Sequence, residues 1–279
     1  MKISIVTPTF NEVENIEKIY LEIKKKINEI NCDYEHLIID NNSTDGTIDK
    51  IRQLAQKDKN LKIIINAKNY GHIRSPFYAL LQTNSDATIL MASDFQDPVD
   101  LIEEYIEKWK NGKKIVLGQK ISSEENKIKY SIRTLFYNFL NKISEFELPK
   151  NTTGSGIFDK SIIDKLKKIN DPYPYFRGLI TELGEEITTI QFRQPLRKSG
   201  ITKNNLLTLY DIGMLGIVKH SRKPLRFMTL LGFLASIASL VVAIIYLFYK
   251  LLFWNSFSLG LAPIIIGIFF VSAVQITLL

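Results

Sequence analysis

The sequence predicts an α/β protein that carries an apolar C-terminal tail. Over roughly the first 120 residues, β-rich runs alternate with helical patterns, and polar clusters follow several of the runs. Charge almost disappears after Arg226. Strands joined by helices of this length favour a parallel sheet with helices on both faces. The chain has 279 residues, 46% of them hydrophobic, which suffices for one large domain with a smaller appendage.

The elements are expected in a regular order along this first part. Compact apolar runs predict five strands, at residues 3–8, 36–40, 61–66, 87–92 and 113–118. The segments between them predict four helices, at residues 15–30, 48–56, 75–82 and 98–110. Residues 43–47 supply turn and capping residues before the second helix. After about residue 120 the alternation is expected to stop.

Two amphipathic helices are expected beyond this point. Residues 127–146 form a basic, aromatic pattern that suits packing on the sheet or lying on a membrane surface. Residues 204–220 lead into the tail. The expected organisation is a cytoplasmic catalytic domain over residues 1–203, a juxtamembrane amphipathic helix over 204–226, and two transmembrane helices over 227–279.

The tail is apolar enough to span a membrane. Residues 227–249 carry no charge, and as a helix they would extend about 34 Å. Residues 251–279 are also uncharged and are interrupted by the expected turn at 255–258. This second span ends at Leu279 without a polar stop, and we expect it to be truncated. A buried core hairpin is the alternative, but both runs are long for one. Five basic or histidine residues precede the first span and predict a cytoplasmic N-terminal part: Lys219, His220, Arg222, Lys223 and Arg226.

Composition excludes some classes of protein. Apart from Lys250, all charged residues lie in the first 226 positions, with 35 basic against 29 acidic residues, which suits an anionic membrane face. A nucleic-acid binder is disfavoured because no long basic run or zinc-type spacing is present. Cys32 is the only cysteine, so no disulfide can form within the chain. The N-terminus lacks the apolar run of a signal peptide.

Polar clusters follow the first, second and fourth predicted strands, at residues 7–12, 40–42 and 94–97. Ligands of parallel sheets bind at the carboxyl ends of the strands, so these clusters predict one site. Asp94 and the amide oxygen of Gln96 could hold Mg²⁺ or Mn²⁺ on the diphosphate of a nucleotide-sugar. Phosphate-loop, dinucleotide-binding and GxSxG hydrolase motifs are absent from the sequence.

Six blocks in order resemble the motifs of family-2 glycosyltransferases: PTFNEVENI, LIIDNNSTDGT, NYGHIRSPFYALLQ, ASDFQDP, DPYPYFRGLITELG and RKSGITKNN. The similarity is to the branch of dolichyl-phosphate mannose synthase and the bactoprenol glucosyltransferases, and it covers the whole chain. This resemblance implies a GT-A fold, an inverting mechanism, a nucleotide-sugar donor, a polyprenyl-phosphate acceptor and a divalent metal. One departure stands out: the family's DADLQDP block has Ala92 in place of its first aspartate.

The resemblance also implies roles for single residues. The donor is expected to contact Pro8, Asn11, Glu12, Asp40, Asn69, Gly71 and Asp94, with Asp40 at the base. The metal is assigned to Asp94 and Gln96, which are also the catalytic candidates together with Glu182 as a base. The stretch 152–156 matches the acceptor loop and contributes Ser155, but the family's frequent arginine is missing there. The acceptor phosphate is therefore assigned to Arg133, Arg177, Arg197 and Lys203.

The leading hypothesis is a multi-pass enzyme of the bacterial inner membrane that moves one sugar onto a polyprenyl phosphate for cell-envelope glycans. A processive polysaccharide synthase is the alternative enzyme, disfavoured because neither Trp109 nor Trp254 belongs to a QxxRW block. The non-enzyme alternative is a membrane-bound homologue that binds a nucleotide-sugar but is catalytically dead. The expected partners are the donor, the lipid acceptor and the bilayer. The sugar, the nucleobase and the formation of a homo-oligomer stay open.

Overall fold

The computed structural model describes residues 1–122, 149, 151–169, 171–195, 211, 214–219, 221–254 and 261–278. The chain divides into two compact units, Met1–Lys219 and His220–Leu279. The helix predicted over residues 127–146 lies outside the described residues. Of the helix predicted over 204–220, residues 211 and 214–219 are described, and they are helical.

The first unit contains a seven-stranded sheet in the order β3-β2-β1-β4-β6-β5-β7. Strands β1 (Lys2–Thr9), β2 (Asp33–Asp40), β3 (Leu61–Ile65) and β4 (Ala87–Leu90) run parallel, as predicted. Strand β6 (Thr152–Asp159) runs antiparallel between β4 and β5 (Ile115–Ser122), and β7 (Ile187–Arg193) pairs with β5 in parallel. The sheet is therefore mixed: the prediction of parallel strands holds for the five strands predicted and is wrong only for the inserted strand β6.

The prediction that the alternation stops near residue 120 is also wrong. Strand β6, helices α6 (Lys160–Ile169) and α7 (Phe176–Glu182), and strand β7 follow that point. The sequence of β6, TTGSGIFD, contains two glycines, which weaken a strand and hide it from a propensity argument. Its partners β4 and β5 precede it by more than 30 residues, so no local pattern marks the pairing.

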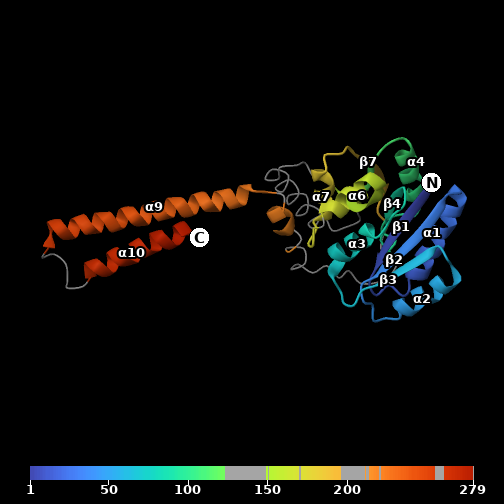
Figure 1. Cartoon of the computed structure of the whole chain (residues 1–279), viewed down its shortest axis with the longest axis horizontal. Coiled ribbons are helices and arrows are strands. Elements are labelled where there is room, and N and C mark those ends of the chain that lie inside the picture. The colour runs from blue at the N-terminus through green and yellow to red at the C-terminus, as the bar shows by residue number, and fades with distance from the viewer. Residues whose placement is uncertain are drawn as a thin grey trace. The chain divides into compact units, whose positions relative to one another are not determined.

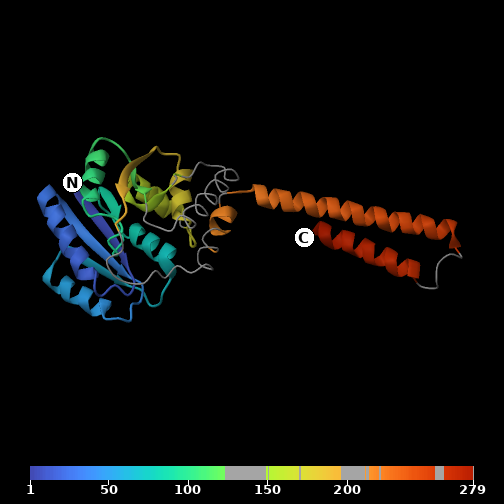
Figure 2. The same ribbon diagram turned by 180° about the vertical axis from the view of Figure 1, so that it is seen from behind.

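Helices cover both faces of the sheet (Figures 1 and 2). Helices α1 (Ile16–Ile30), α2 (Thr47–Lys57) and α4 (Leu101–Lys110) bury apolar side chains in one cluster against the sheet. Helix α3 (Gly71–Leu81), α6 and α7 bury theirs in a second cluster on the other face. The four predicted helices α1 to α4 are confirmed, although α3 begins at Gly71 rather than Ser75 and α4 at Leu101 rather than Pro98.

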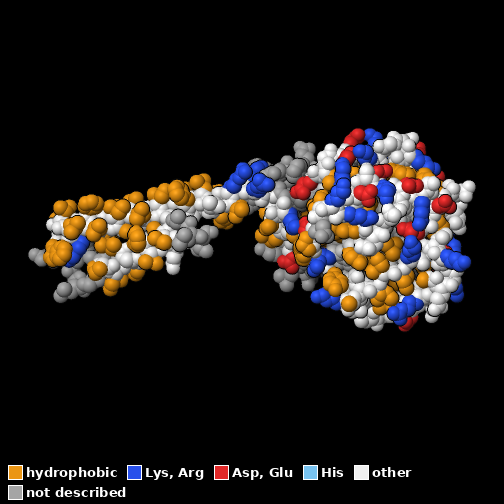
Figure 3. All heavy atoms as spheres, viewed as in Figure 1, with side chains coloured by type: hydrophobic (Ala, Val, Ile, Leu, Met, Phe, Trp, Pro, Cys, Tyr) orange, Lys and Arg blue, Asp and Glu red, His pale blue; other side chains and the backbone are white. Residues whose placement is uncertain are grey.

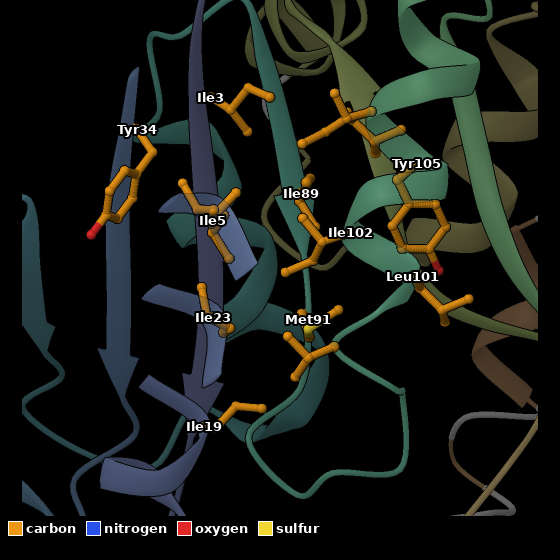
Figure 4. Close-up of a cluster of buried hydrophobic side chains, with 14 of the residues drawn as sticks. Ile3, Ile5, Ile19, Ile23, Tyr34, Ile89, Met91, Leu101, Ile102 and Tyr105 are labelled. Carbon is orange, nitrogen blue, oxygen red and sulfur yellow. The ribbon is translucent and has the colours of Figure 1, made fainter. Parts of the chain in front are cut away.

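The larger buried cluster fixes how α1 and α4 lie on the sheet. Figure 4 shows Ile3 and Ile5 of β1 with Ile19 and Ile23 of α1, and it shows the side chain of Ile102 from α4 in the same layer. All five are fully buried. Each contributes about 1.5–3 kcal/mol of transfer free energy, so together they hold α1 and α4 against the sheet at β1.

The described residues of the second unit form two antiparallel helices, α9 (Lys223–Leu252) and α10 (Leu261–Leu278). The Ser236 hydroxyl donates to the carbonyl of Ala273 at 2.8 Å, and the Ser239 hydroxyl donates to the carbonyl of Phe269 at 2.7 Å. Hydrophobic side chains cover the visible face of this unit (Figure 3). Leu225–Leu252 is long and apolar enough to cross a membrane, whereas the apolar stretch of α10, Pro263–Ile276, is shorter. The turn predicted at 255–258 lies outside the described residues.

Candidate functional site

The carboxyl ends of β1, β2, β3 and β4 lie side by side and are tied together by backbone hydrogen bonds. The N–H of Asn41 donates to the carbonyl of Thr9 at 3.0 Å, and the N–H of Asn66 donates to the carbonyl of Asp40 at 2.9 Å. Between β1 and β4, the N–H of Met91 donates to the carbonyl of Val6 at 3.0 Å. The polar clusters predicted after these strands therefore share one edge of the sheet, where parallel sheets bind ligands.

The loop after β1 depends on Asn11. Its φ of +53° lies in the left-handed region, which asparagine tolerates better than most residues. Its N–H donates to the hydroxyl of Ser43 at 2.7 Å, and its side-chain oxygen accepts from the N–H of Thr44 at 2.8 Å. Asn11 thus joins the loop after β1 to the loop after β2.

Asp40 supports this junction through Ser43. Its carboxylate accepts from the hydroxyl of Ser43 at 2.6 Å and from the N–H of Ser43 at 2.8 Å. The side chain of Asp40 is fully buried. The structure therefore gives Asp40 a role in holding Ser43, and through Ser43 it holds Asn11. Contact of Asp40 with a base stays a prediction.

Pro8 and Glu12 flank Asn11. The carbonyl of Pro8 accepts a hydrogen bond from the hydroxyl of Ser93 at 3.1 Å, which links the end of β1 to the segment after β4. The N–H of Glu12 donates to the hydroxyl of Thr47 at 3.0 Å, and its carboxylate accepts from the side-chain amide of Asn15 at 2.7 Å. Glu12 is buried, and it fixes the start of α1 beside the site.

Asp94 and Gln96 lie in the turn after β4. Phe95 between them has a φ of +59° and a buried side chain. Buried and partly exposed side chains alternate along this turn, and Asp94 and Gln96 are partly exposed. The Asp94 carboxylate accepts one hydrogen bond among the described residues, from the N–H of Gln96 to Oδ1 at 3.2 Å. Its second oxygen is therefore available to a ligand.

This donor set fits a hard divalent cation. Mg²⁺ and Mn²⁺ take oxygen ligands, and Mg²⁺ is commonly held by one or two carboxylates with substrate phosphates completing its shell. Within the described part of the chain, no three His, Cys, Asp or Glu side chains gather to hold a metal by themselves. A cation bound at Asp94 would therefore take its remaining ligands from the amide oxygen of Gln96 and from substrate oxygens.

Asp97, three residues beyond Asp94, is buried and is bound to β6. The hydroxyl of Ser155 donates a hydrogen bond to the Asp97 carboxylate. We expected residues 152–156 to be an acceptor loop, but they belong to strand β6. Between the pairs Leu117–Gly156 and Gln119–Thr152, β6 has more residues than β5, and Gly154 there has a φ of +90°. This irregularity turns Ser155 toward the segment after β4.

Arg177 lies beside the same irregularity. A Cβ atom added to Gly154 would be 3.8 Å from the Arg177 Nε atom. Desolvation and then the Arg177 charge lower the pKa of His72, which places Arg177 near the start of α3 as well. Two tyrosine rings contact the guanidinium of Arg74 in α3, with the Tyr70 centroid at 5.6 Å and the Tyr173 centroid at 5.7 Å.

The remaining predicted residues fall into two groups. Glu182 is exposed at the last position of α7, about 7 Å further along the helix axis than Arg177. Three of the predicted acceptor residues lie outside the described residues: Arg133, Arg197 and Lys203. Among the described candidates, the structure therefore brings Ser155 and Arg177 together near the turn of Asp94 and leaves Glu182 at the far end of its helix.

Asn69 and Gly71 lie where β3 leads into α3. Asn41 at the end of β2 donates from Nδ2 to the Asn69 Oδ1 atom at 2.7 Å, and the N–H of Gly71 donates to the same oxygen at 2.8 Å. Sequence reasoning missed the roles of Asn41, Ser43 and Asp97. The run Asp40-Asn41-Asn42-Ser43 directly after a strand was the available signal for the first two, because such residues hydrogen-bond to loops.

Comparison with known proteins agrees with this arrangement. The sequence model described as "Glycosyl transferase family 2" matches residues 4–167, more than half of the chain. A bactoprenol glucosyl transferase of Shigella phage SfX is 28% identical over 278 residues, which cover 99% of this chain and 90% of that protein. The glycosyltransferase YkcC of Bacillus subtilis (strain 168) is 29% identical over 264 residues, 94% of this chain and 81% of its own.

A solved structure shows the same fold. Glucosyl-3-phosphoglycerate synthase from Mycobacterium tuberculosis, in complex with Mn²⁺, UDP and phosphoglyceric acid, superposes with a TM-score of 0.53. The identity is 18%, and the likeness covers 77% of this chain and 76% of that one. The first unit therefore has the expected GT-A fold. Together with the family match over residues 4–167, this shows that the chain belongs to glycosyl transferase family 2 and is a glycosyltransferase.

Proposed function

We propose that the chain moves one sugar from a nucleotide-sugar to a membrane polyprenyl phosphate, with inversion at the transferred carbon. The product would be a polyprenyl-phosphate sugar used for cell-envelope glycans. The observation that carries this proposal is the combination, in one chain, of a family-2 domain with α9, a helix long enough to cross a bilayer. The similarity to a bactoprenol glucosyl transferase of Shigella phage SfX extends over 99% of the chain and so includes both parts.

The donor would lie along the edge formed by the ends of β3, β2, β1 and β4. Asn11, Pro8 and Glu12 would border the ribose and base from β1 and the loop after it. Asp40 would support them through Ser43, since both Asp40 oxygens accept from that residue. Asn69 and Gly71 would border the pocket at β3, and Asp94 would lie at the diphosphate.

Asp94 and Gln96 would hold a divalent cation, Mg²⁺ or Mn²⁺, on the diphosphate. When bound, such a cation offsets the negative charge that develops on the leaving diphosphate. The second carboxylate oxygen of Asp94 has no hydrogen bond from any other described residue, which supports this assignment. The related fold in complex with Mn²⁺ and UDP supports it as well.

The acceptor phosphate would lie near Arg177 and Ser155, with Arg133, Arg197 and Lys203 as further cationic contacts. Guanidinium groups bind phosphate oxygens through paired hydrogen bonds. A phosphate oxygen would attack the anomeric carbon while the bond to the diphosphate oxygen breaks. A phosphate monoester is largely dianionic at neutral pH, because its second pKa is about 6, so no proton has to be removed. Glu182 would be the base only if the acceptor reacts as a monoanion.

The second unit would hold the enzyme at its acceptor. We propose that α9 and α10 both cross the bacterial inner membrane and that residues 1–203 face the cytoplasm, joined through residues 204–226. The charged residues Arg222, Lys223 and Arg226 at the start of α9 support this orientation. In sealed inner-membrane vesicles of known orientation, protease applied to the cytoplasmic face should digest the first unit. Digestion from the opposite face would contradict the orientation.

The test of the function is transfer to lipid. Membranes containing the chain, a polyprenyl phosphate and Mn²⁺ are incubated with a panel of nucleotide-sugars, and the lipid is analysed by mass spectrometry. One added sugar per lipid with one of the donors supports the proposal. Several added sugars would indicate a processive synthase. Absence of metal-dependent nucleotide-sugar binding in a parallel titration would indicate a dead homologue.

A further inference from the structure

The outer face of α3 carries exposed aromatic and basic side chains. Tyr70, Arg74 and Tyr78 follow one another at intervals of four residues, so they lie on one side of the helix, and all three are exposed. The exposed fractions of Tyr70 and Tyr78 are 37% and 51%. The Arg74 guanidinium is 5.6 Å from the centroid of the Tyr70 ring, and the Lys68 Nζ atom lies over the same ring at 5.3 Å. These side chains form a stripe along the helix.

Tyr173 extends this stripe onto the segment before α7. Its ring centroid is 5.7 Å from the Arg74 guanidinium, and 51% of the residue is exposed. Arg74 therefore contacts two tyrosine rings that come from distant parts of the chain. We call this set the aromatic–basic surface: Lys68, Tyr70, Arg74, Tyr78 and Tyr173.

The aromatic–basic surface bears positive charge without neighbouring acids in the sequence. No Asp or Glu occurs between Asp58 and Asp86, or from Pro172 to Thr181. Positive charge of this kind suits an anionic partner. Tyrosine has an apolar ring and a polar hydroxyl, and together with Lys and Arg it anchors proteins at the headgroups of a bilayer. The helix in the same chain that is long enough to cross a bilayer favours a membrane over a nucleic acid or an acidic protein.

The segment that carries Tyr173 is bound to the helix that leads toward α9. The Lys219 Nζ atom donates to both carboxylate oxygens of Asp171, at 2.8 and 3.0 Å. A Cβ atom added to Gly216 would lie 3.3 Å from the Tyr175 ring, so the glycine lets the helix and the ring approach closely. Residues 220–222 alone separate Lys219 from the start of α9. The aromatic–basic surface therefore adjoins the part of the first unit from which the chain continues into α9.

This helix also exposes apolar side chains. Met214 and Val218 are four residues apart and therefore share one face, where they are 38% and 69% exposed. Gly216 is buried against Tyr175 on the opposite face. A surface helix of a soluble protein has the reverse pattern, with its apolar face inward. The outward apolar face indicates contact with lipid, as in helices that lie in a membrane interface.

We infer that the aromatic–basic surface lies in the headgroup layer of the bilayer and that anionic phospholipid is its partner. Lys68 and Arg74 contact lipid phosphates, and the three tyrosine rings lie at the boundary with the acyl chains, their hydroxyls toward water. Helices α3 and α1 pack on opposite faces of the sheet, so α1 faces away from the membrane. The inference rests on the proposed function in one respect, because it requires α9 to hold the chain at a membrane.

The test measures which side of the first unit contacts the membrane, with a fluorescent label on the full chain in lipid nanodiscs. Cys32→Ser removes the native thiol, and Ala67→Cys places the label at an exposed position beside Lys68. Gln53→Cys is the control position, exposed in α2 on the other face of the sheet. The nanodiscs contain phosphatidylcholine alone or with phosphatidylglycerol, and a lipid with a spin-labelled headgroup quenches a label that lies at the surface. The quenched fraction gives the ratio of docked to undocked first units, and no nucleotide or metal is added.

In nanodiscs with phosphatidylglycerol, the label at residue 67 is expected to be quenched and the label at residue 53 to stay unquenched. Arg74→Gln should lower the docked ratio about fivefold there, the contribution of one cation near an anionic surface. Arg52→Gln removes an exposed charge of α2 and should leave the ratio unchanged. Raising the salt to about 1 M, where charges interact only within about 3 Å, should lower the ratio in the same way as Arg74→Gln.

Tyr78→Ser and Tyr173→Ser separate the apolar contribution from the charge. Both should lower the docked ratio in neutral and in anionic nanodiscs, because the burial of a ring does not depend on lipid charge. Arg74, Tyr78 and Tyr173 are exposed, so the three variants should keep the stability of the unchanged chain within about 0.5 kcal/mol, which thermal unfolding checks.

Three results would overturn the inference while leaving the proposed function intact. The label at residue 67 could be quenched no more than the label at residue 53, or its quenching could survive Arg74→Gln and both serine variants. Burial of the label at residue 67 that increases with protein concentration in detergent would show that a second copy of the chain covers the surface. If the chain does not stay with the nanodiscs, the proposed membrane attachment itself fails, and the inference fails with it.

Discussion

The hydroxyl of Ser155 donates a hydrogen bond to the carboxylate of Asp97 across a separation of 58 residues in the chain. Both residues are buried. The bond joins the irregular part of β6 to the segment that carries Asp94 and Gln96. The placement of the candidate cation ligands therefore depends on a strand that the chain reaches only after α4 and β5 are complete.

Replacing Ser155 with alanine should lower both stability and activity. Loss of a hydrogen bond to a buried carboxylate costs about 1–3 kcal/mol, and the segment from Asp94 to Asp97 loses its tie to β6. Ser161→Ala is the matched control, because the Ser161 hydroxyl donates to Asp159 at 2.6 Å at the other end of β6. Thermal unfolding and transfer assays should show a loss of stability in both variants and a loss of activity in Ser155→Ala. Equal activity in the two variants would contradict a role for Ser155 at the site.

Asp94→Asn should leave the fold intact and abolish transfer. The asparagine oxygen can still accept from the N–H of Gln96, so the stability change should stay within about 0.5 kcal/mol. Loss of the carboxylate that holds the cation should cost about 4 kcal/mol of transition-state stabilisation, or about a thousandfold in rate. Asp100→Asn changes an exposed acid nearby and should keep its activity. Near-wild-type transfer by Asp94→Asn under saturating Mn²⁺ would show that Asp94 does not hold the cation.

Ala92→Asp should keep activity and tighten metal binding. Ala92 is partly exposed two residues before Asp94, so a carboxylate there could join the same cation. The measurement is the Mn²⁺ concentration that gives half-maximal transfer, which should fall in the variant. An unchanged or higher Mn²⁺ requirement would mean that position 92 does not face the cation.

His36 should make the first unit less stable in mild acid. Burial lowers the pKa of His36 from 6.5 to about 4 in the folded chain, where its Nε2 atom bonds to the Thr7 hydroxyl at 2.9 Å. The unfolded chain takes up a proton below pH 6.5, whereas the folded chain does so only near pH 4. Stability is therefore retained above pH 6.5 and lost as the pH falls from 6.5 to 4, by about 3 kcal/mol.

The measurement is thermal unfolding of the full chain in detergent between pH 7.5 and pH 4, compared with His36→Gln. A glutamine can still bond to Thr7 but does not titrate, so the variant should lose less stability over this interval. Burial raises the pKa of Glu35, but hydrogen bonds from Lys62, Ser4 and Lys2 outweigh this and hold it at about 2. Glu35 therefore also lowers stability as the pH falls below about 5, but equally in both proteins, so the difference between them reports His36. Parallel pH profiles for the two proteins would exclude His36 as the cause.

Gly156→Ala should strongly destabilise the sheet. Gly156 lies in β6 opposite Leu90 of β4 and Leu117 of β5, and an added Cβ would come within 2.2 Å of the Val116 carbonyl oxygen. Backbone atoms cannot move aside cheaply, so the cost should be about 3 kcal/mol or more. Gly112→Ala is the control. Gly112 has a φ of +87°, but a Cβ added there would meet open space, so the variant should lose about 1–2 kcal/mol of stability. Similar melting temperatures for the two variants would contradict the steric argument.

The sequence alone determined the local elements and the position of the polar clusters. Helices α1, α2, α3 and α4 and the four parallel strands follow from periodicity, because a half-buried helix or strand needs apolar residues at its own spacing. The end of β4 at Leu90 and the acids that follow it predicted a site at the sheet edge, and the apolar run after Arg226 predicted α9. These features depend on residues that are close together in the chain.

Only the tertiary structure decided how the distant parts meet. Strand β6 enters between β4 and β5, and this insertion makes the sheet mixed and brings Ser155 to Asp97. Asp40 holds Ser43 instead of reaching the surface, and Asn41 orients Asn69 across 28 residues of chain. The physical reason is that strand pairing and side-chain hydrogen bonds between distant residues depend on which surfaces pack together in the folded chain. The spacing of neighbouring residues does not specify this packing.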